Sequence, residues 1–129
     1  MKTIVRMVDV PINDWNNQTK GTVTLEISDG EFVLLLGPNG SGKSYLLNLM
    51  AALRVPRVGE VFLEGKRLTK MSERQKRAWR AGLGLIPSDP VLLNGYTVLE
   101  GLVLTAQLLG KSAADAKRNA LESASLCGL

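Results

Sequence analysis

The fold is decided by the stretch Gly37-Pro38-Asn39-Gly40-Ser41-Gly42-Lys43-Ser44, which fits the phosphate-loop pattern G-x-x-x-x-G-K-[ST]. Phosphate binding needs a concave array of backbone N–H groups, and residues without a side chain let the main chain curl closely enough to supply it. Gly37, Gly40 and Gly42 meet that need. The plain alternative is a glycine-rich turn that binds nothing. The pattern favours a loop that holds the phosphates of a nucleotide.

The segments around the loop support this interpretation. Residues 32–36 are all apolar and predict a buried strand, and residues 44–53 predict a helix. A helix that begins at the loop points its positive dipole at the bound phosphates. In that arrangement Lys43 reaches the β- and γ-phosphates, and the Ser44 hydroxyl is a magnesium ligand. ATP and Mg²⁺ are therefore the expected ligands.

Composition restricts the class of protein. The chain has 129 residues with 45% hydrophobic content, which is enough for one domain with a core and too short for two. No apolar stretch reaches the roughly 18 residues of a membrane span, and the N-terminus lacks the apolar core of a signal peptide. The single cysteine, Cys127, excludes an intrachain disulfide, and no histidine is present. We expect a cytoplasmic protein.

Positive charge is concentrated in one segment. The formal net charge is +4, and seven of the 16 Lys and Arg residues fall between positions 66 and 80, namely Lys66, Arg67, Lys70, Arg74, Lys76, Arg77 and Arg80. The ordinary interpretation is the solvated face of a helix, and the alternative is contact with phospholipid headgroups or an acidic partner. Nucleic acid is disfavoured because Trp79 is the only aromatic residue there and no nucleic-acid-binding motif is present.

The order of segments predicts strands first and helices later. Residues 22–27 alternate as a half-buried strand, Glu60–Leu63 forms a short strand before a Glu64-Gly65 turn, and residues 83–86 form a core strand that Pro87 stops. Capping boxes at Ser72 and Thr97 each open a helix, and Ser112 caps a last helix beyond Gly110. The helix after Thr97 has one apolar face, made of Leu99, Leu102, Val103, Ala106 and Leu109.

This order, together with the loop, resembles the nucleotide-binding subunit of an ATP-binding cassette (ABC) transporter. The resemblance rests on Gly30-Glu31, the phosphate loop, residues 46–53, Gly59-Glu60-Val61, Glu64-Gly65-Lys66 and Thr97-Val98-Leu99-Glu100. It implies an α/β P-loop NTPase core with an antiparallel β-region beside it and C-terminal helices from the helical subdomain. Residues 71–80 and 109–112 are most similar to the lipoprotein-release, macrolide-export and cell-division branch.

The resemblance also implies further site residues. The phosphate-binding set extends from Gly37 to Tyr45, where the family usually has threonine and where a phenol either crowds the phosphate or packs on the helix. At the family's glutamine position, which helps to hold magnesium, this chain has Ser88, followed by Asp89 as a weak substitute. Trp15 is the candidate for stacking on adenine, or else packs on the β-region. Trp79 is expected on the buried side of the basic helix.

Two groups that the family needs for hydrolysis are not found in the sequence. No carboxylate follows a run of four apolar residues after the loop, and the Leu-Ser-Gly-Gly-Gln signature does not occur. We therefore expect residues 1–129 to be the N-terminal part of one ABC ATPase domain, without catalytic residues of its own and inactive alone. Apolar side chains such as Leu34 and Leu36 should then be partly uncovered and promote self-association.

The expected function follows from the resemblance. It is an ATP-binding subunit that couples ATP binding and hydrolysis to transport, located peripherally on the cytoplasmic face of a membrane. Its expected partners are a transmembrane subunit and, as a homodimer or heterodimer, a second ATP-binding subunit. The alternative is a truncated or degenerate fragment that binds nucleotide without hydrolysis. A P-loop kinase or GTPase is disfavoured because the sequence has no Asn-Lys-x-Asp motif and a different order of strands.

Overall fold

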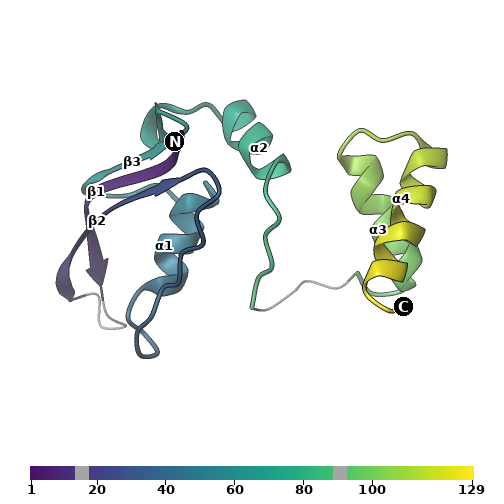
Figure 1. The fold of residues 1–129 in the computed structure, drawn as a ribbon, viewed down its shortest axis with the longest axis horizontal. Helices are drawn as coiled ribbons and strands as arrows, with labels where there is room; N and C mark the ends of the chain where they lie inside the picture. Colours follow the sequence, from purple (N-terminus) through teal and green to yellow (C-terminus); the bar gives the residue numbers. More distant parts are fainter. Residues whose placement is uncertain (14–17, 89–92) are drawn as a thin grey trace. The chain divides into compact units, whose positions relative to one another are not determined.

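The computed structural model describes residues 1–13, 18–88 and 93–129. The chain divides into two compact units, residues 1–85 and residues 86–129, and each is described by itself (Figure 1). Within the described residues, no helix has both the length and the apolar character that crossing a bilayer requires.

The first unit is built on a four-stranded antiparallel sheet. Its strands are β1 (Thr3–Asn13), β2 (Thr19–Ser28), β3 (Glu60–Leu63) and β4 (Lys66–Arg67), in the order β2-β1-β3-β4. Val5 of β1 lies opposite Ile27 of β2 on one side and opposite Leu63 of β3 on the other. The strand predicted at 22–27 lies inside β2, and the strand predicted at Glu60–Leu63 has those bounds, so both predictions are confirmed.

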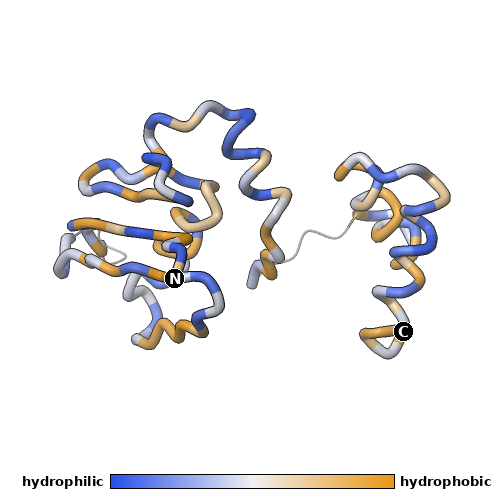
Figure 2. Tube along the Cα trace, turned by 45° about the horizontal axis from the view of Figure 1, so that its top comes forward, coloured by the Kyte–Doolittle hydropathy of each residue, from blue (hydrophilic) through white to orange (hydrophobic). Residues whose placement is uncertain are grey.

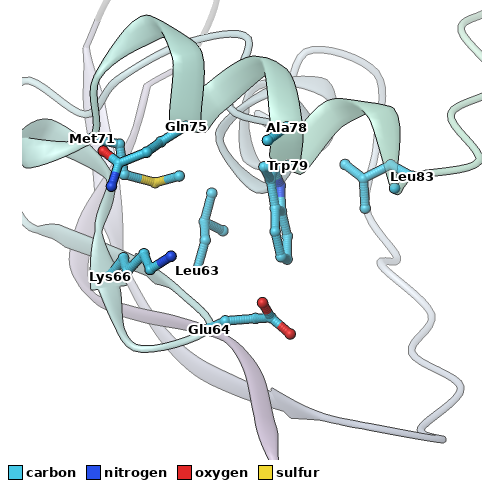
Figure 3. Close-up of a pocket in the computed structure, with 9 residues that line it drawn as sticks. Leu63, Glu64, Lys66, Met71, Gln75, Ala78, Trp79 and Leu83 are labelled. Atoms are coloured by element: carbon cyan, nitrogen blue, oxygen red, sulfur yellow. The ribbon is translucent and has the colours of Figure 1, made fainter. Parts of the chain in front are cut away.

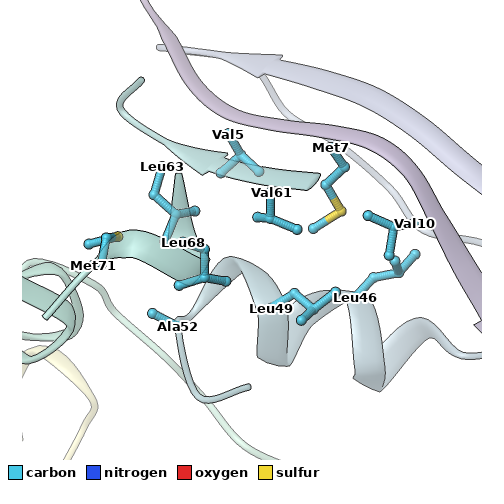
Figure 4. Packing of buried hydrophobic residues seen from close by; sticks show 10 residues of the cluster. All are labelled: Val5, Met7, Val10, Leu46, Leu49, Ala52, Val61, Leu63, Leu68 and Met71. Atoms are coloured by element: carbon cyan, nitrogen blue, oxygen red, sulfur yellow. The ribbon is translucent and has the colours of Figure 1, made fainter. Parts of the chain in front are cut away.

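Helix α1 (Lys43–Met50) packs against one face of this sheet (Figures 1 and 4). Leu49 is completely buried and Leu46 nearly so, because their spacing of three residues puts both on the helix face that meets the sheet. The core they share also contains Val5, Met7, Val10, Ala52, Val61, Leu63, Leu68 and Met71. The helix predicted at 44–53 is therefore confirmed, although it ends three residues earlier. Because Leu46 and Leu49 anchor α1 on the sheet, the end of the phosphate loop that leads into this helix is held in place.

A tight hairpin joins β3 to β4. Glu64 and Gly65 have φ values of 45° and 76°, and two successive positive values identify the two-residue turn that suits the twist of paired strands. The predicted turn is confirmed. A short 3₁₀ helix, η1 (Leu68–Lys70), then leads to the second α-helix of the unit.

Helix α2 (Glu73–Ala81) begins with the predicted capping box. The Gln75 N–H donates to the Ser72 hydroxyl at 3.3 Å, and the Ser72 N–H donates to the Gln75 side-chain carbonyl at 2.8 Å. The far end of the helix is tied to the turn after α1. Trp79 Nε1 donates to the Met50 carbonyl and Arg80 to the Ala52 carbonyl, both at 2.7 Å. These two bonds hold α2 against the end of α1 within the first unit.

The second unit consists of two helices that pack on each other (Figure 1). Helix α3 (Val98–Leu108) starts at the capping box of Thr97 and Glu100, and α4 (Ala113–Leu126) starts at Ser112, whose hydroxyl accepts from the Asp115 N–H at 3.1 Å. Ala116 and Ala120 are buried. Both predicted helix starts are confirmed.

Two predicted strands are wrong. Residues 32–36 and 83–86 belong to no strand or helix, and Phe32, Leu36 and Ile86 are 93%, 82% and 94% exposed. An apolar run becomes a strand only when another strand accepts its hydrogen bonds, and every strand among the described residues belongs to the antiparallel sheet. In Figure 2 the segment that leads from α2 to the grey residues is coloured as hydrophobic. The expected exposure of Leu34 and Leu36 is confirmed.

Candidate functional site

The phosphate loop occupies residues 37–42, between the extended segment 32–36 and helix α1. Gly40 and Gly42 have φ values of 79° and 89°, in the left-handed region that favours glycine. Gly42 is the N-cap of α1, and among the described residues no side chain makes a capping hydrogen bond to the start of this helix. The first N–H groups of α1 consequently have no intrahelical acceptor and face the loop end of the helix, where an anion is stabilised.

Gly37 lies where the loop is tightly packed. A Cβ atom at this position would lie 2.7 Å from the Ser41 hydroxyl oxygen, closer than such atoms approach in proteins. The chain returns on itself here, and the Ser41 N–H donates to the Pro38 carbonyl at 3.3 Å. A side chain at position 37 would therefore require the Ser41 hydroxyl to rotate away from its present place in the loop.

Lys43 folds back over the loop that precedes it. Its ammonium donates to the carbonyls of Gly37 and Pro38, both at 2.7 Å, and lies 3.4 Å from the Ser41 hydroxyl. A positive charge at a helix N-terminus is unfavourable with respect to the helix dipole, and the two carbonyls offset that cost. The loop thus holds a half-buried positive charge beside the first N–H groups of α1, which have no acceptor within the helix.

The next two residues of α1 have different environments. Ser44 is exposed at the start of the helix, whereas the Tyr45 ring is half-buried and packs against the core cluster. Of the two interpretations of Tyr45, the structure favours packing on the protein. The packed Tyr45 ring anchors the first turn of α1 on the core.

The donor set of the loop fits a nucleotide phosphate with magnesium. Backbone N–H groups and an ammonium suit phosphate oxygens, and the exposed Ser44 hydroxyl offers an oxygen to a hard cation. Within residues 1–13, 18–88 and 93–129, no three Asp, Glu, Cys or His side chains gather into a metal site. A magnesium ion here would accordingly depend on the nucleotide and water for most of its ligands.

Three further predicted site residues lie either outside the described residues or outside the unit that carries the loop. Trp15 and Asp89 lie outside the described residues. Ser88 is exposed and belongs to the second unit. Their roles at adenine and magnesium stay predictions.

Two hollows of the first unit lie away from the loop. One of about 370 Å³ lies between α2 and the β3–β4 hairpin, with Leu63, Met71 and Trp79 around it and Glu64 and Lys66 at its rim (Figure 3). Another, of about 470 Å³, is lined by Arg6, Glu26 and Phe62 among others. Neither of these two hollows includes a phosphate-loop residue, and the loop is defined here by its donors.

Two contacts were not anticipated from the sequence. The inward position of Trp79 was expected and is confirmed, but its bond to the Met50 carbonyl ties α2 to the helix that carries the loop. The bonds from Lys43 to the two loop carbonyls were likewise not foreseen. The sequence offers one signal for the contact between Trp79 and Met50, namely a tryptophan within a basic helix. Such a tryptophan turns inward, and its buried indole N–H then needs an acceptor.

Comparison with known proteins identifies the family. A protein-family model described as ABC transporter matches residues 21–127. An uncharacterized ABC transporter ATP-binding protein of Thermotoga maritima is 33% identical, over all of this chain and 57% of its own length. The lipoprotein-releasing system ATP-binding protein LolD of Xanthomonas oryzae pv. oryzae is 37% identical, over 81% of this chain and 43% of its own.

The solved structures agree. The ATP-binding cassette MJ0796, in a dimeric post-hydrolysis state bound to ADP and Pi, has a TM-score of 0.82 and 26% identity, covering 98% of this chain and 58% of that one. The chain thus spans about half the length of the relatives it matches. The predicted relationship is confirmed, and so is the fold as part of an ABC ATPase cassette. The chain belongs to the ABC transporter family.

Proposed function

We propose that the phosphate loop binds the phosphates of magnesium-ATP, and that the whole protein couples ATP binding and hydrolysis to transport across a membrane. The observation that carries this proposal is the Lys43 ammonium, held by the Gly37 and Pro38 carbonyls beside the uncapped start of α1. The related MJ0796 cassette, described as bound to ADP and Pi, supports the same ligand class.

Each residue of the loop has a separate task in this proposal. The N–H groups that follow Gly40 and Gly42 surround the phosphates, and Lys43 neutralises their charge. The Ser44 hydroxyl contributes one ligand to magnesium, which supplies charge neutralisation when bound. The first turn is rigid because Tyr45 and Leu46 pack into the core. The end of the loop that joins α1 is therefore held in place before nucleotide binds.

The whole protein would act at a membrane with partners. We propose a peripheral position on the cytoplasmic face, a transmembrane subunit and a second ATP-binding subunit. Support comes from LolD, which is named as part of a lipoprotein-releasing system, and from the dimeric state of MJ0796. The LolD relationship also supports a place in the lipoprotein-release branch.

The test is calorimetric titration of magnesium-ATP into the wild-type chain and Lys43→Ala. A hydrogen bond to a charged group contributes about 1.5 to 3 kcal/mol, so the variant should bind roughly 10- to 100-fold more weakly. Lys117→Ala removes an exposed positive charge from α4 and serves as the matched control. Equal affinity of wild type and Lys43→Ala would overturn the assignment of the loop.

A further inference from the structure

The acidic side chains in the basic segment (residues 66–80) and just before it all form ion pairs. Glu60 pairs with Arg67, Glu64 with Lys2 at 2.6 Å, and Glu73 with Lys76 at 2.9 Å. These pairs occupy every acidic side chain between positions 60 and 80. The other cations of the segment consequently lack a carboxylate of their own.

Three of these cations form what we call the basic face of α2, namely Arg74 and Arg77 in the helix and Lys70 at the end of η1, just before it. All three are exposed, and among the described residues none has an ion-pair partner. Another side of the helix borders the hollow beside the hairpin, which Gln75, Ala78 and the half-buried Trp79 line (Figure 3). The basic face is therefore a solvated surface with an excess of positive charge.

A second basic segment adjoins the far end of α2. Arg80 donates to the Ala52 carbonyl, so the loop that follows Ala52 begins beside this helix. In that loop the exposed Arg54 and Arg57 alternate with apolar side chains, of which Leu53 and Val55 are 50% and 46% exposed. Cations interleaved with exposed aliphatic groups suit the boundary between lipid headgroups and acyl chains.

We propose that the basic face of α2, with the adjoining loop 53–58, binds anionic phospholipid headgroups. The inference rests on the proposed role at a membrane. Charge alone does not separate lipid from nucleic acid, because both are anionic. The aromatic residue favours lipid over single-stranded nucleic acid, because Trp79, the only aromatic residue of segment 66–80, is half-buried with its indole N–H bonded to the Met50 carbonyl. It is not available as a stacking platform for bases.

The distribution of charge in the chain supports the same surface. Thirteen of the 16 Lys and Arg residues and eight of the 12 Asp and Glu residues precede residue 86, so the first unit is positive and the second slightly negative. Each Lys or Arg near an anionic bilayer strengthens binding about fivefold at physiological salt. The attraction should weaken as ionic strength rises.

The test is co-sedimentation of the chain with vesicles of phosphatidylcholine alone or mixed with phosphatidylglycerol. Binding should require phosphatidylglycerol and decrease with added salt. Arg74→Glu combined with Arg77→Glu should weaken it by about 25-fold or more, and Arg74→Lys with Arg77→Lys should retain it. Lys111→Glu with Lys117→Glu makes the same change in net charge on exposed sites of the second unit and should have little effect.

Several results would overturn the proposal. One is equal binding of the chain to both vesicle types, and another is undiminished binding of the variant Arg74→Glu with Arg77→Glu. An equal loss of binding in the control variant Lys111→Glu with Lys117→Glu would also overturn it. So would tighter binding of the chain to single-stranded RNA than to vesicles. Magnesium-ATP titration of the same samples separates the two proposals. Retained ATP binding without vesicle binding would refute the lipid surface alone.

Discussion

The two apolar segments on either side of the phosphate loop have opposite fates. Residues 46–50 of α1 bury Leu46 and Leu49 against the sheet, whereas residues 32–36 leave Phe32, Leu34 and Leu36 largely exposed. Both segments are strongly apolar, so hydrophobicity alone does not decide the outcome. The difference is a partner, because α1 satisfies its backbone internally and a strand depends on a neighbour. The loop is thus supported from the α1 side.

The largest expected effect is on catalysis, because the structure supports the phosphate loop from the α1 side only. Phosphoryl transfer to water depends on groups positioned around the terminal phosphate, and the loop with Lys43 and Ser44 supplies one side of that arrangement. We expect the 129-residue chain to bind magnesium-ATP without steady-state phosphate release above that of Lys43→Ala. Lys43-dependent turnover of about one per second would show that the second side is also present.

The next effect is on stability. Leu49→Ala removes a completely buried side chain from the core and should lower the free energy of unfolding by about 2 to 5 kcal/mol. Leu36→Ala makes the same chemical change at a side chain that is 82% exposed and should alter it by about 0.5 kcal/mol or less. Denaturant unfolding measures both. Similar losses in the two variants would mean that the segments do not differ as described.

A smaller effect is expected in the second unit. Thr97→Ala removes the hydroxyl that accepts from the Glu100 N–H at 3.2 Å, and should cost about 1 kcal/mol of helix stability. The readout is amide exchange in α3, with α1 as the internal reference because its N-cap, Gly42, has no side chain to lose. An unchanged α3 would show that the capping box contributes nothing.

The smallest effect concerns pH. The hydrogen bond from the Thr97 N–H, and then that from the Thr97 hydroxyl, lower the pKa of Glu100 from its usual 4.5. A lowered pKa in the folded state stabilises the helix above 4.5, and this contribution is lost as the pH falls through the folded-state value. Glu100→Gln should remove that part of the acid sensitivity of α3. Identical acid titrations of α3 in wild type and variant would contradict this.

Local signals predicted most of the fold. The capping boxes at Ser72 and Thr97, the turn at Glu64-Gly65 and the loop glycines act through neighbouring residues, and the structure has each of them. The strands at 32–36 and 83–86 were predicted from apolarity, but strand formation depends on residues distant in sequence. The position of the Lys43 ammonium was also not predictable, because a flexible side chain chooses its acceptors only in the folded loop.

Hydrogen exchange with and without magnesium-ATP tests the central claim most directly, namely that the phosphate loop is built from the α1 side and binds nucleotide there. Amides of α1 from Leu46 onward should be protected, because they are hydrogen-bonded within the helix, and those of residues 32–36 should exchange rapidly. Magnesium-ATP should add protection at residues 40–44 in the wild type and not in Lys43→Ala. Protected amides at 32–36 without nucleotide, or unchanged exchange at 40–44 with it, would contradict the account.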